Sequence, residues 1–292
     1  LYVSSYHTPY DWNDAIEGSL ETTLEGKCEL RKFYMDGKRN LGEDFAKKKA
    51  LEAKQLIDSW KPDVVIAADD NASKYLVMPY LKDAPVPVVF CGINWTAEYY
   101  GYPYSNATGM IEVGPIDRLA NEVISTVRNA KRGVFLSADE MTQYKEVERS
   151  REAYGKHGIS IDHLPVRSMA DWEAGYRKAQ EADFLIIGNN AGINDWDDQR
   201  AAAFALENAG RFTVAYLEWM APYAMLTMAK IAEEQGEWAG KAAVMILSGT
   251  SPRAIPIVAN RRWNMYANLP QLDKTGHRLS QDVLLKAVRV GE

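Results

Sequence analysis

The sequence predicts an α/β protein built from two similar lobes, and three observations carry this prediction. Short apolar runs alternate with longer stretches of helical spacing, which is typical of parallel α/β architecture. The alternation stops at residues 94–109, which are rich in Tyr, Asn, Gly and Pro, and then starts again. The chain has 292 residues, enough for about two domains.

Composition and charge exclude several classes of protein. Hydrophobic residues make up 47% and charged residues 25% of the chain, as in ordinary globular proteins. The formal net charge is -6, so there is no basic excess to neutralise nucleic acid or an anionic membrane. No apolar run approaches the roughly 20 residues that cross a bilayer. We therefore expect a soluble chain with no nucleic-acid partner.

The first residues bear on the compartment, whereas the two cysteines do not identify it. The sequence begins with strand-like residues and shows no leader, so we expect that an upstream segment was processed or lies outside this sequence, which hints at export. Cys28 and Cys91 form no C-x-x-C motif, and each position suits a small buried apolar residue. We do not expect a disulfide between them.

In the first lobe, strands are predicted at residues 1–6, 30–35, 64–68 and 86–91. Between the second and third strands, apolar residues spaced by three and four predict a helix over residues 46–60. The lysines at 47–49 then lie mostly on its solvated face, and Pro62 ends the helix.

The same alternation predicts the second lobe. Helices are expected at 115–127, 143–157 and 223–247, and strands at 133–136, 159–164, 184–187 and 212–217. A Ser-Gly-Thr-Ser-Pro turn and a strand-like segment ending near Tyr266 follow, and residues 281–290 have a helix-like apolar pattern.

Catalytic motifs are absent from the sequence. It contains no phosphate-binding loop, no G-x-G-x-x-G after the first strand, no H-E-x-x-H and no G-x-S-x-G. The histidines are scattered, with no pair at the spacing of a helical metal site; they are His7, His157, His163 and His277. His157 beside Gly158 suits the end of a helix. We expect no catalytic residues, no metal and no cofactor.

Polar and aromatic residues follow the predicted strands in both lobes. In open α/β sheets, ligands bind outside the carboxyl ends of the strands. Aromatic faces there would stack on a small organic ligand, Asn would orient it, and Asp70 or Glu218 would pair with an amine or hydroxyl group. The candidate ligand residues of the first lobe are Tyr6, His7, Trp12, Asp70, Asn71, Asn94 and Trp95. Those of the second lobe are Asn189, Asn190, Glu218 and Trp219.

Each candidate also has a structural alternative. Asp69, Asp70 and Asn71 either cap the next helix or contact ligand, and one residue can do each. Tyr10 and Trp12 either pack the first helix onto the sheet or face the ligand. The acidic cluster at 195–198 lacks the pattern of a calcium loop, which favours a role at a helix entry. The tyrosines at 99, 100, 102 and 104 either cover a seam between the lobes or touch ligand.

Five segments together resemble a known family. They are Ser-Tyr-His-Thr-Pro-Tyr-Asp-Trp at 5–12, Phe-Tyr-Met-Asp-Gly-Lys-Arg at 33–39, Asp-Asp-Asn-Ala at 69–72, Val-Val-Phe-Cys-Gly-Ile-Asn at 88–94 and Asn-Ala-Thr-Gly at 106–109. In this order they resemble the substrate-binding proteins of ABC transporters with a type I periplasmic-binding fold. Related sequences occur as extracellular sensor domains of bacterial histidine kinases. The resemblance covers about residues 1–285.

The resemblance implies two Rossmann-like lobes joined by three crossovers, a three-strand hinge, that close on a ligand in the cleft between them. The crossovers would fall near residues 106–111, 219–223 and 252–256. The first lobe would comprise 1–108 and 222–255, and the second 109–221 and 256–292. Some members bind aromatic amino acids, whereas this chain departs from simple members at Trp95, Trp219 and the tyrosine-rich connection.

The leading hypothesis is therefore a bacterial solute-binding protein, periplasmic or extracellular, that is not an enzyme. It would act as a monomer that captures a small polar or aromatic molecule, with amino acids included, and presents it to an ABC transporter permease. The main alternative is the ligand-sensing ectodomain of a histidine kinase or cyclase. A third hypothesis, an α/β enzyme using His7, Asp69 and Asp70, lacks an identifiable nucleophile and base.

Overall fold

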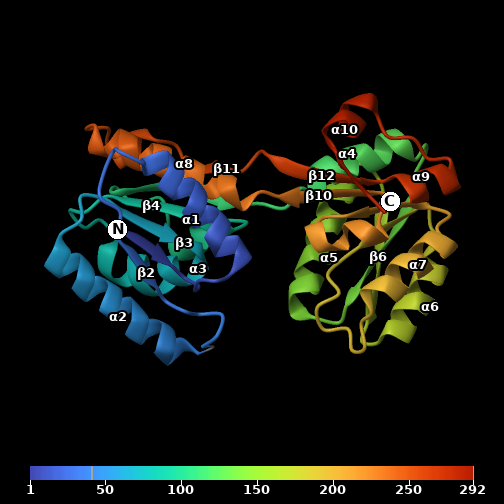
Figure 1. Ribbon diagram of the computed structural model, residues 1–292, viewed down its shortest axis with the longest axis horizontal. Coiled ribbons are helices and arrows are strands. Elements are labelled where there is room, and N and C mark those ends of the chain that lie inside the picture. The colour runs from blue at the N-terminus through green and yellow to red at the C-terminus, as the bar shows by residue number, and fades with distance from the viewer. Residues whose placement is uncertain (41, 292) are drawn as a thin grey trace. The chain divides into compact units, whose positions relative to one another are not determined.

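The computed structural model describes residues 1–40 and 42–291, which form two compact units (Figure 1). Unit 1 comprises Leu1–Val113 and Ile231–Arg262, and unit 2 comprises Gly114–Lys230 and Trp263–Glu292. Each unit has its own sheet with helices packed against it. The predicted α/β class with two Rossmann-like lobes is thus confirmed.

Unit 1 contains a six-stranded parallel sheet in the order β11-β5-β4-β3-β1-β2. Its strands are β1 (Tyr2–Ser4), β2 (Lys32–Tyr34), β3 (Val65–Ala68), β4 (Val88–Asn94), β5 (Ala107–Glu112) and β11 (Val258–Ala259). The central strands carry apolar residues on both faces because both faces are covered. Since the strands are parallel, β1, β3 and β4 end side by side at one edge.

Helices cover both faces of the unit 1 sheet (Figure 1). On one face α1 (Asp11–Leu24) packs against α8 (Ala232–Leu247), burying Ile16 and Leu20 with Ala239 and Ala243. The other face is covered by α2 (Glu43–Trp60) and by the wider π-helical segment η1 (Ala72–Leu81). The remaining short helices are α3 (Asp69–Asn71), η2 (Glu98–Tyr100) and η4 (Pro252–Ala254).

Unit 2 contains a seven-stranded sheet in the order β13-β12-β10-β9-β8-β6-β7, in which only the β10/β12 pairing is antiparallel among the described strands. Its strands are β6 (Arg132–Ala138), β7 (Ser160–Val166), β8 (Phe184–Ile187), β9 (Phe212–Ala215), β10 (Leu226–Lys230), β12 (Trp263–Asn268) and β13 (Val288–Val290). Its helices are α4 (Ile116–Thr126), α5 (Met141–Gly155), α6 (Met169–Ala179), α7 (Asp198–Asn208), η3 (Glu218–Tyr223), α9 (Leu269–Thr275) and α10 (Gln281–Lys286). Trp172 of α6 and Phe204 of α7 lie in one core cluster.

Three predicted segments were wrong in part. The helix predicted over 223–247 begins only at Ala232, because β10 precedes it; every residue of β10 before Lys230 is buried, so its apolar run fits a helix and a strand equally well. The predicted connection at 94–109 contains the start of β5. The helix-like pattern at 281–290 divides into α10 and β13.

The two cysteines are free, and they differ in exposure. Cys91 on β4 is buried, as expected, whereas Cys28 after α1 is exposed, so the expectation of a buried position there was wrong. None of the helices in the described part of the chain is long and apolar enough to span a membrane.

The chain passes from one unit to the other after Val113, Lys230 and Arg262. The predicted crossover segments lie earlier: 106–111 is mostly β5, 219–223 belongs to η3 and 252–256 includes η4. Buried polar side chains hold two of the passing segments inside unit 1. The Asn260 amide accepts from the Val113 N–H at 2.7 Å and donates to its carbonyl at 3.2 Å. The Glu234 carboxylate accepts from the Arg262 N–H at 2.9 Å.

Candidate functional site

The carboxyl edge of the unit 1 sheet brings several predicted residues together. The Asp70 carboxylate, just after β3, accepts hydrogen bonds from the Asn94 amide at the end of β4 and from the Tyr100 hydroxyl, each at 2.8 Å. Burial, and then the Asp70 charge, raises the pKa of Tyr100 well above its usual range, so this hydroxyl stays protonated. Asp70 therefore lies in a network that already supplies a donor to each of its oxygens.

Trp12 lies next to the same turn. Its indole N–H donates to Asp69 Oδ1 at 3.1 Å, and its ring packs beside the α1/α8 core cluster. Asp69 is 1% exposed and has a φ of 67°. The first N–H group of η1, that of Ala72, donates to the Ser5 hydroxyl at 2.8 Å. No Asp or Asn side chain caps α3 or η1, so the capping alternative finds no support.

A group of rings and charges follows β1. Tyr6 meets the Tyr10 ring edge-on at 5.4 Å, and His7 stacks on Tyr10 at 5.7 Å. Lys38, after β2, places its ammonium 4.8 Å from the centre of the Tyr6 ring. Burial, with the nearby Asp69 charge, raises the pKa of Tyr6 well above its usual range. The structure thus brings Tyr6 and His7 together and adds Tyr10 and Lys38.

The remaining unit 1 candidates are placed mainly by the backbone. Asn71 lies so close to Gly37 that a Cβ there would come 2.6 Å from Asn71 Nδ2. Trp95 has a φ of 63°, and its N–H donates to the Glu112 carbonyl at 2.8 Å. Trp95 directly follows Asn94, the last residue of β4.

In unit 2 the predicted residues cluster after β8 and β9. Asn189 Oδ1 accepts from the Ala191 N–H at 2.9 Å and from the Trp219 indole at 3.4 Å. Trp219 is 55% exposed, and Glu218 beside it is also exposed. Asn190 is half-buried, and its carbonyl accepts from the Ile193 N–H. Asn189 and Trp219 are therefore joined by a hydrogen bond, and Asn190 and Glu218 are their neighbours in sequence.

Two further groups at this edge are not among the candidate ligand residues. The Asp139 carboxylate, after β6, accepts from Arg167 Nε and from the Tyr144 hydroxyl, each at 2.7 Å, and these bonds lower the pKa of Asp139. The buried Gln143 side chain accepts hydrogen bonds from the Asn189 backbone N–H and from the buried Tyr216 hydroxyl. The signal for Asp139 was its strand-end position, whereas neither Gln143 nor Tyr216 stood out from an apolar or helical pattern.

The acidic cluster at 195–198 serves helix entry. Asp197 caps α7 by accepting from the Arg200 N–H at 3.0 Å, and Asp198 accepts from the Tyr223 hydroxyl at 2.6 Å. Among the described residues, no group of three or more His, Cys, Asp or Glu side chains is arranged to hold a metal ion.

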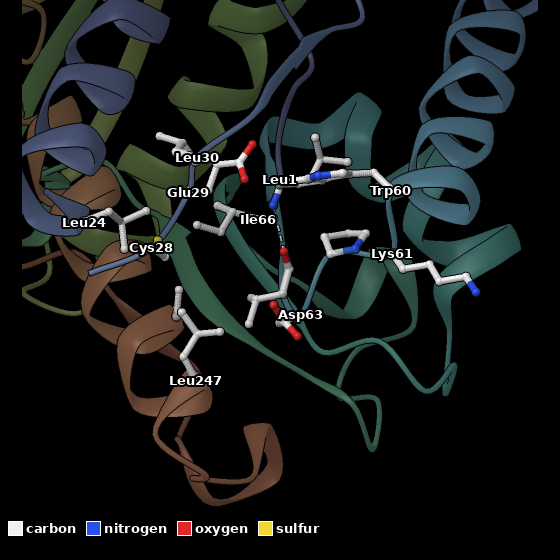
Figure 2. A pocket seen from close by; sticks show the side chains of 13 residues that line it. Leu1, Leu24, Cys28, Glu29, Leu30, Trp60, Lys61, Asp63, Ile66 and Leu247 are labelled. Carbon is white, nitrogen blue, oxygen red and sulfur yellow. Dashed lines mark hydrogen bonds between the residues drawn. The ribbon is translucent and has the colours of Figure 1, made fainter. Parts of the chain in front are cut away.

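A separate pocket of about 250 Å³ lies in unit 1 (Figure 2). Leu1, Leu30 and Val64 in its wall precede β1, β2 and β3, so the pocket lies at the amino ends of these strands. Figure 2 shows Trp60 and Leu247 among its other lining residues. The predicted ligand residues lie at the opposite, carboxyl edge of this sheet and do not line the pocket.

Comparison with known proteins gives structural likeness only. No family model and no curated protein matches the chain. An open, ligand-free substrate-binding protein with adhesive properties from Clostridium difficile has a TM-score of 0.75 and 15% identity, covering 99% of this chain and 97% of its own. An ABC domain from Streptococcus pneumoniae in complex with L-Trp has a TM-score of 0.59 and 15% identity, covering 99% of both chains.

A third solved structure extends the range of bound solutes. It is an ABC transporter solute-binding protein from Agrobacterium vitis with bound D-fucose, with a TM-score of 0.55 and 12% identity, covering 96% of this chain and 99% of its own. These likenesses confirm the predicted type I periplasmic-binding fold. Two of the three are substrate- or solute-binding proteins, and the two bound molecules, L-Trp and D-fucose, differ in chemistry.

Proposed function

We propose that this chain is an extracytoplasmic solute-binding protein of an ABC-type uptake system, located in the periplasm or outside the cell. It binds one small polar or aromatic organic molecule, with amino acids the first class to test, and delivers it to a membrane permease as a monomer. The observation that carries this proposal is the gathering of aromatic, amide and carboxylate groups at the carboxyl edge of each sheet, in a fold shared with solute-binding proteins.

In this proposal a single ligand uses groups from both units. Tyr6, Asn94 and Trp95 contribute from unit 1, and Asn190 and Trp219 contribute from unit 2. Aromatic faces suit stacking, and amides can donate and accept, so the combination fits a flat molecule with polar substituents. Ligand binding would favour closure about the three crossovers, because the closed state binds the ligand better.

Thermal unfolding with a solute panel tests the proposal. The protein is first unfolded and refolded to remove any bound solute, and is then melted with L-tryptophan, L-leucine, D-fucose, other amino acids, purines, pyrimidines and amines. A solute at about 100 times its dissociation constant should stabilise the native state by about 2.7 kcal/mol, which raises the melting temperature measurably. No shift with any member would contradict the proposed solute class.

Alanine variants test the assigned residues with the solute that gives the largest shift. Trp95→Ala and Asn190→Ala should each weaken binding about tenfold or more, because each removes a group proposed to contact ligand. Asn208→Ala is the control for Asn190→Ala, since Asn208 is also half-buried and its side chain donates to the Phe204 carbonyl within α7. Unchanged affinity in both test variants would remove these residues from the site.

A further inference from the structure

A buried glutamine joins three elements at the carboxyl edge of unit 2. Gln143 lies on α5 and is 3% exposed. Its Oε1 accepts from the Asn189 backbone N–H at 2.8 Å and from the Tyr216 hydroxyl at 2.9 Å. Asn189 follows β8 and Tyr216 follows β9, so one amide oxygen ties α5 to two strand ends.

The connection continues from Gln143 to the exposed ring of Trp219. The Asn189 N–H is held by Gln143, and the Asn189 carbonyl accepts from the Ala138 N–H of β6 at 2.9 Å. The Asn189 side chain accepts from the Trp219 indole at 3.4 Å. Because the main chain of Asn189 is fixed on both sides, its side chain presents a fixed acceptor to the indole.

Packing around Gly188 shows that the Gln143 side chain fills its space. A Cβ at Gly188 would lie 2.6 Å from Gln143 Oε1 and 2.6 Å from both the Phe135 ring and Ser137 Cβ. Real Cβ atoms do not approach neighbours that closely, so the strand end and the amide oxygen fit only with glycine there. The Gln143 oxygen is therefore enclosed against β8.

We propose that Gln143 is a positioning residue that sets the orientation of the Trp219 ring through Asn189. The Trp219 ring and the Asn189 side chain are called the solute platform of unit 2, and Gln143 thereby sets its shape. The inference rests on the proposed function for the role of that platform. It gives Gln143 no contact with the solute. The amide oxygen accepts from two donors. A side chain of the same length that also ends in an acceptor should therefore preserve the orientation of the Trp219 ring.

Fluorine NMR of 5-fluorotryptophan-labelled full-length protein tests the positioning without any ligand, and Trp219→Phe assigns the Trp219 resonance. Gln143→Met removes the acceptor at similar length, and should shift and broaden that resonance and raise quenching of Trp219 by acrylamide. Gln143→Glu keeps an acceptor, and should leave the resonance close to its wild-type position. An unchanged Trp219 signal in Gln143→Met would overturn the proposal.

Gln180→Met is a matched control for lost stability. Gln180 Oε1 also accepts from two donors, the Gly210 and Arg211 N–H groups at 3.0 and 2.9 Å, but these precede β9. This variant should lose stability and leave the Trp219 resonance unchanged, and an equal Trp219 shift here would show that general loosening is the cause. If Gln143→Met does not fold, Tyr216→Phe, which removes one of the two donors, should move the resonance in the same direction by less, and no movement would reject the proposal.

L-tryptophan titration then links the platform to binding. With L-tryptophan as the probe, Gln143→Met should bind about tenfold more weakly than wild type, and Gln143→Glu and Gln180→Met should bind within about threefold. Wild-type protein that fails to bind any member of the solute panel counts against the proposed function, whereas the ligand-free NMR signal decides the positioning role by itself. Equal weakening in Gln143→Met and Gln180→Met would contradict the link between the platform and binding.

Discussion

The two units carry comparable strand ends, yet they hold them with different groups. In unit 1 the fully buried Ser5 hydroxyl donates to the Ala68 carbonyl at 2.6 Å and accepts from the Ala72 N–H at 2.8 Å, which fixes the turn after β3. In unit 2 the Gln143 amide holds the turn after β8 from a neighbouring helix. A short hydroxyl serves where the support comes from the end of the adjacent strand, β1, and a longer amide serves where it comes from a helix.

The difference extends to what each edge leaves exposed. In unit 1 the two aspartates are drawn into contacts with the chain itself, since Asp69 accepts from Trp12 and Asp70 accepts from Asn94 and Tyr100. In unit 2, Glu218 and Trp219 extend into solvent. A strand-end position therefore indicates which residues gather at the edge, but it does not indicate which of them stay available to a ligand.

The largest expected effect is on the free energy of unfolding, when the glycines at the strand ends of the two units, Gly92 and Gly188, are replaced. Gly92 in unit 1 has a φ of +70°, and a Cβ there would lie 2.7 Å from Asp69 Oδ1. Gly92→Ala should lower the free energy of unfolding by about 3 to 4 kcal/mol, because it adds backbone strain to the overlap, whereas Gly188→Ala in unit 2 should cost about 1 to 3 kcal/mol from overlap alone. Urea unfolding measures both, and Gly18→Ala, in open space within α1, is the control for an added methyl group and should stabilise by about 0.5 to 1 kcal/mol. An equal cost at both glycines would mean that the positive φ is not the source of the difference.

Ser5→Ala tests how strongly unit 1 depends on its short support. Without the hydroxyl, the Ala72 N–H loses its buried acceptor, so we expect a loss of about 1 to 3 kcal/mol in urea unfolding. Ser59→Ala removes an exposed hydroxyl that donates to the Leu56 carbonyl, and should change stability by less than about 0.5 kcal/mol. If the two substitutions cost the same, the Ser5 bridge does not stabilise the turn.

Two buried tyrosines give a smaller contrast. Tyr2 in unit 1 donates to Asn13 Oδ1 at 3.0 Å, whereas the buried Tyr154 hydroxyl in unit 2 has no hydrogen-bond partner among residues 1–40 and 42–291. Tyr2→Phe should cost about 1 kcal/mol, and Tyr154→Phe should be neutral or stabilising by up to about 1 kcal/mol. Thermal or urea unfolding of the two variants measures this difference. A larger loss of stability in Tyr154→Phe than in Tyr2→Phe would contradict the prediction.

The smallest effect concerns pH. Burial lowers the pKa of His163 and of His277, both in unit 2, below the usual 6.5. As the pH falls from about 7 to about 5, the unfolded chain takes up protons at these positions before the folded unit does, so the free energy of unfolding decreases. The double variant His163→Gln and His277→Gln should show a shallower decrease in urea unfolding at several pH values. A slope as steep as that of the wild type would exclude these two residues as its source.

Much of the fold follows from local pattern, and the exceptions have identifiable causes. The spacing over 46–60 predicts most of α2, and the apolar run at 184–187 matches β8 residue for residue. The run in β10 misleads because only Ile231 separates this strand from α8, so no turn residue marks the boundary. Periodicity detects one apolar face, and where both faces are covered the boundaries of the run must decide between strand and helix.

The candidate site was predictable in its strand-end residues and not in their supports. Asp70 and Asn94 follow or end neighbouring strands, and the structure joins them at 2.8 Å. Tyr100 reaches the edge from the short helix η2 and Gln143 from the first turn of α5, so their participation depends on how those elements pack. Such contacts between distant elements leave no local signal in a single sequence.

The pairing of α1 with α8 has a consequence for synthesis on the ribosome. The apolar face of α1, with Ile16, Leu20 and Leu24, is completed by residues that emerge more than two hundred positions later in the chain. Until Ala239 and Ala243 have left the exit tunnel, that face lacks the part of its native cover that α8 supplies. A nascent chain therefore carries an incompletely covered apolar stripe through most of its translation, and surfaces of this kind are the ones that chaperones protect.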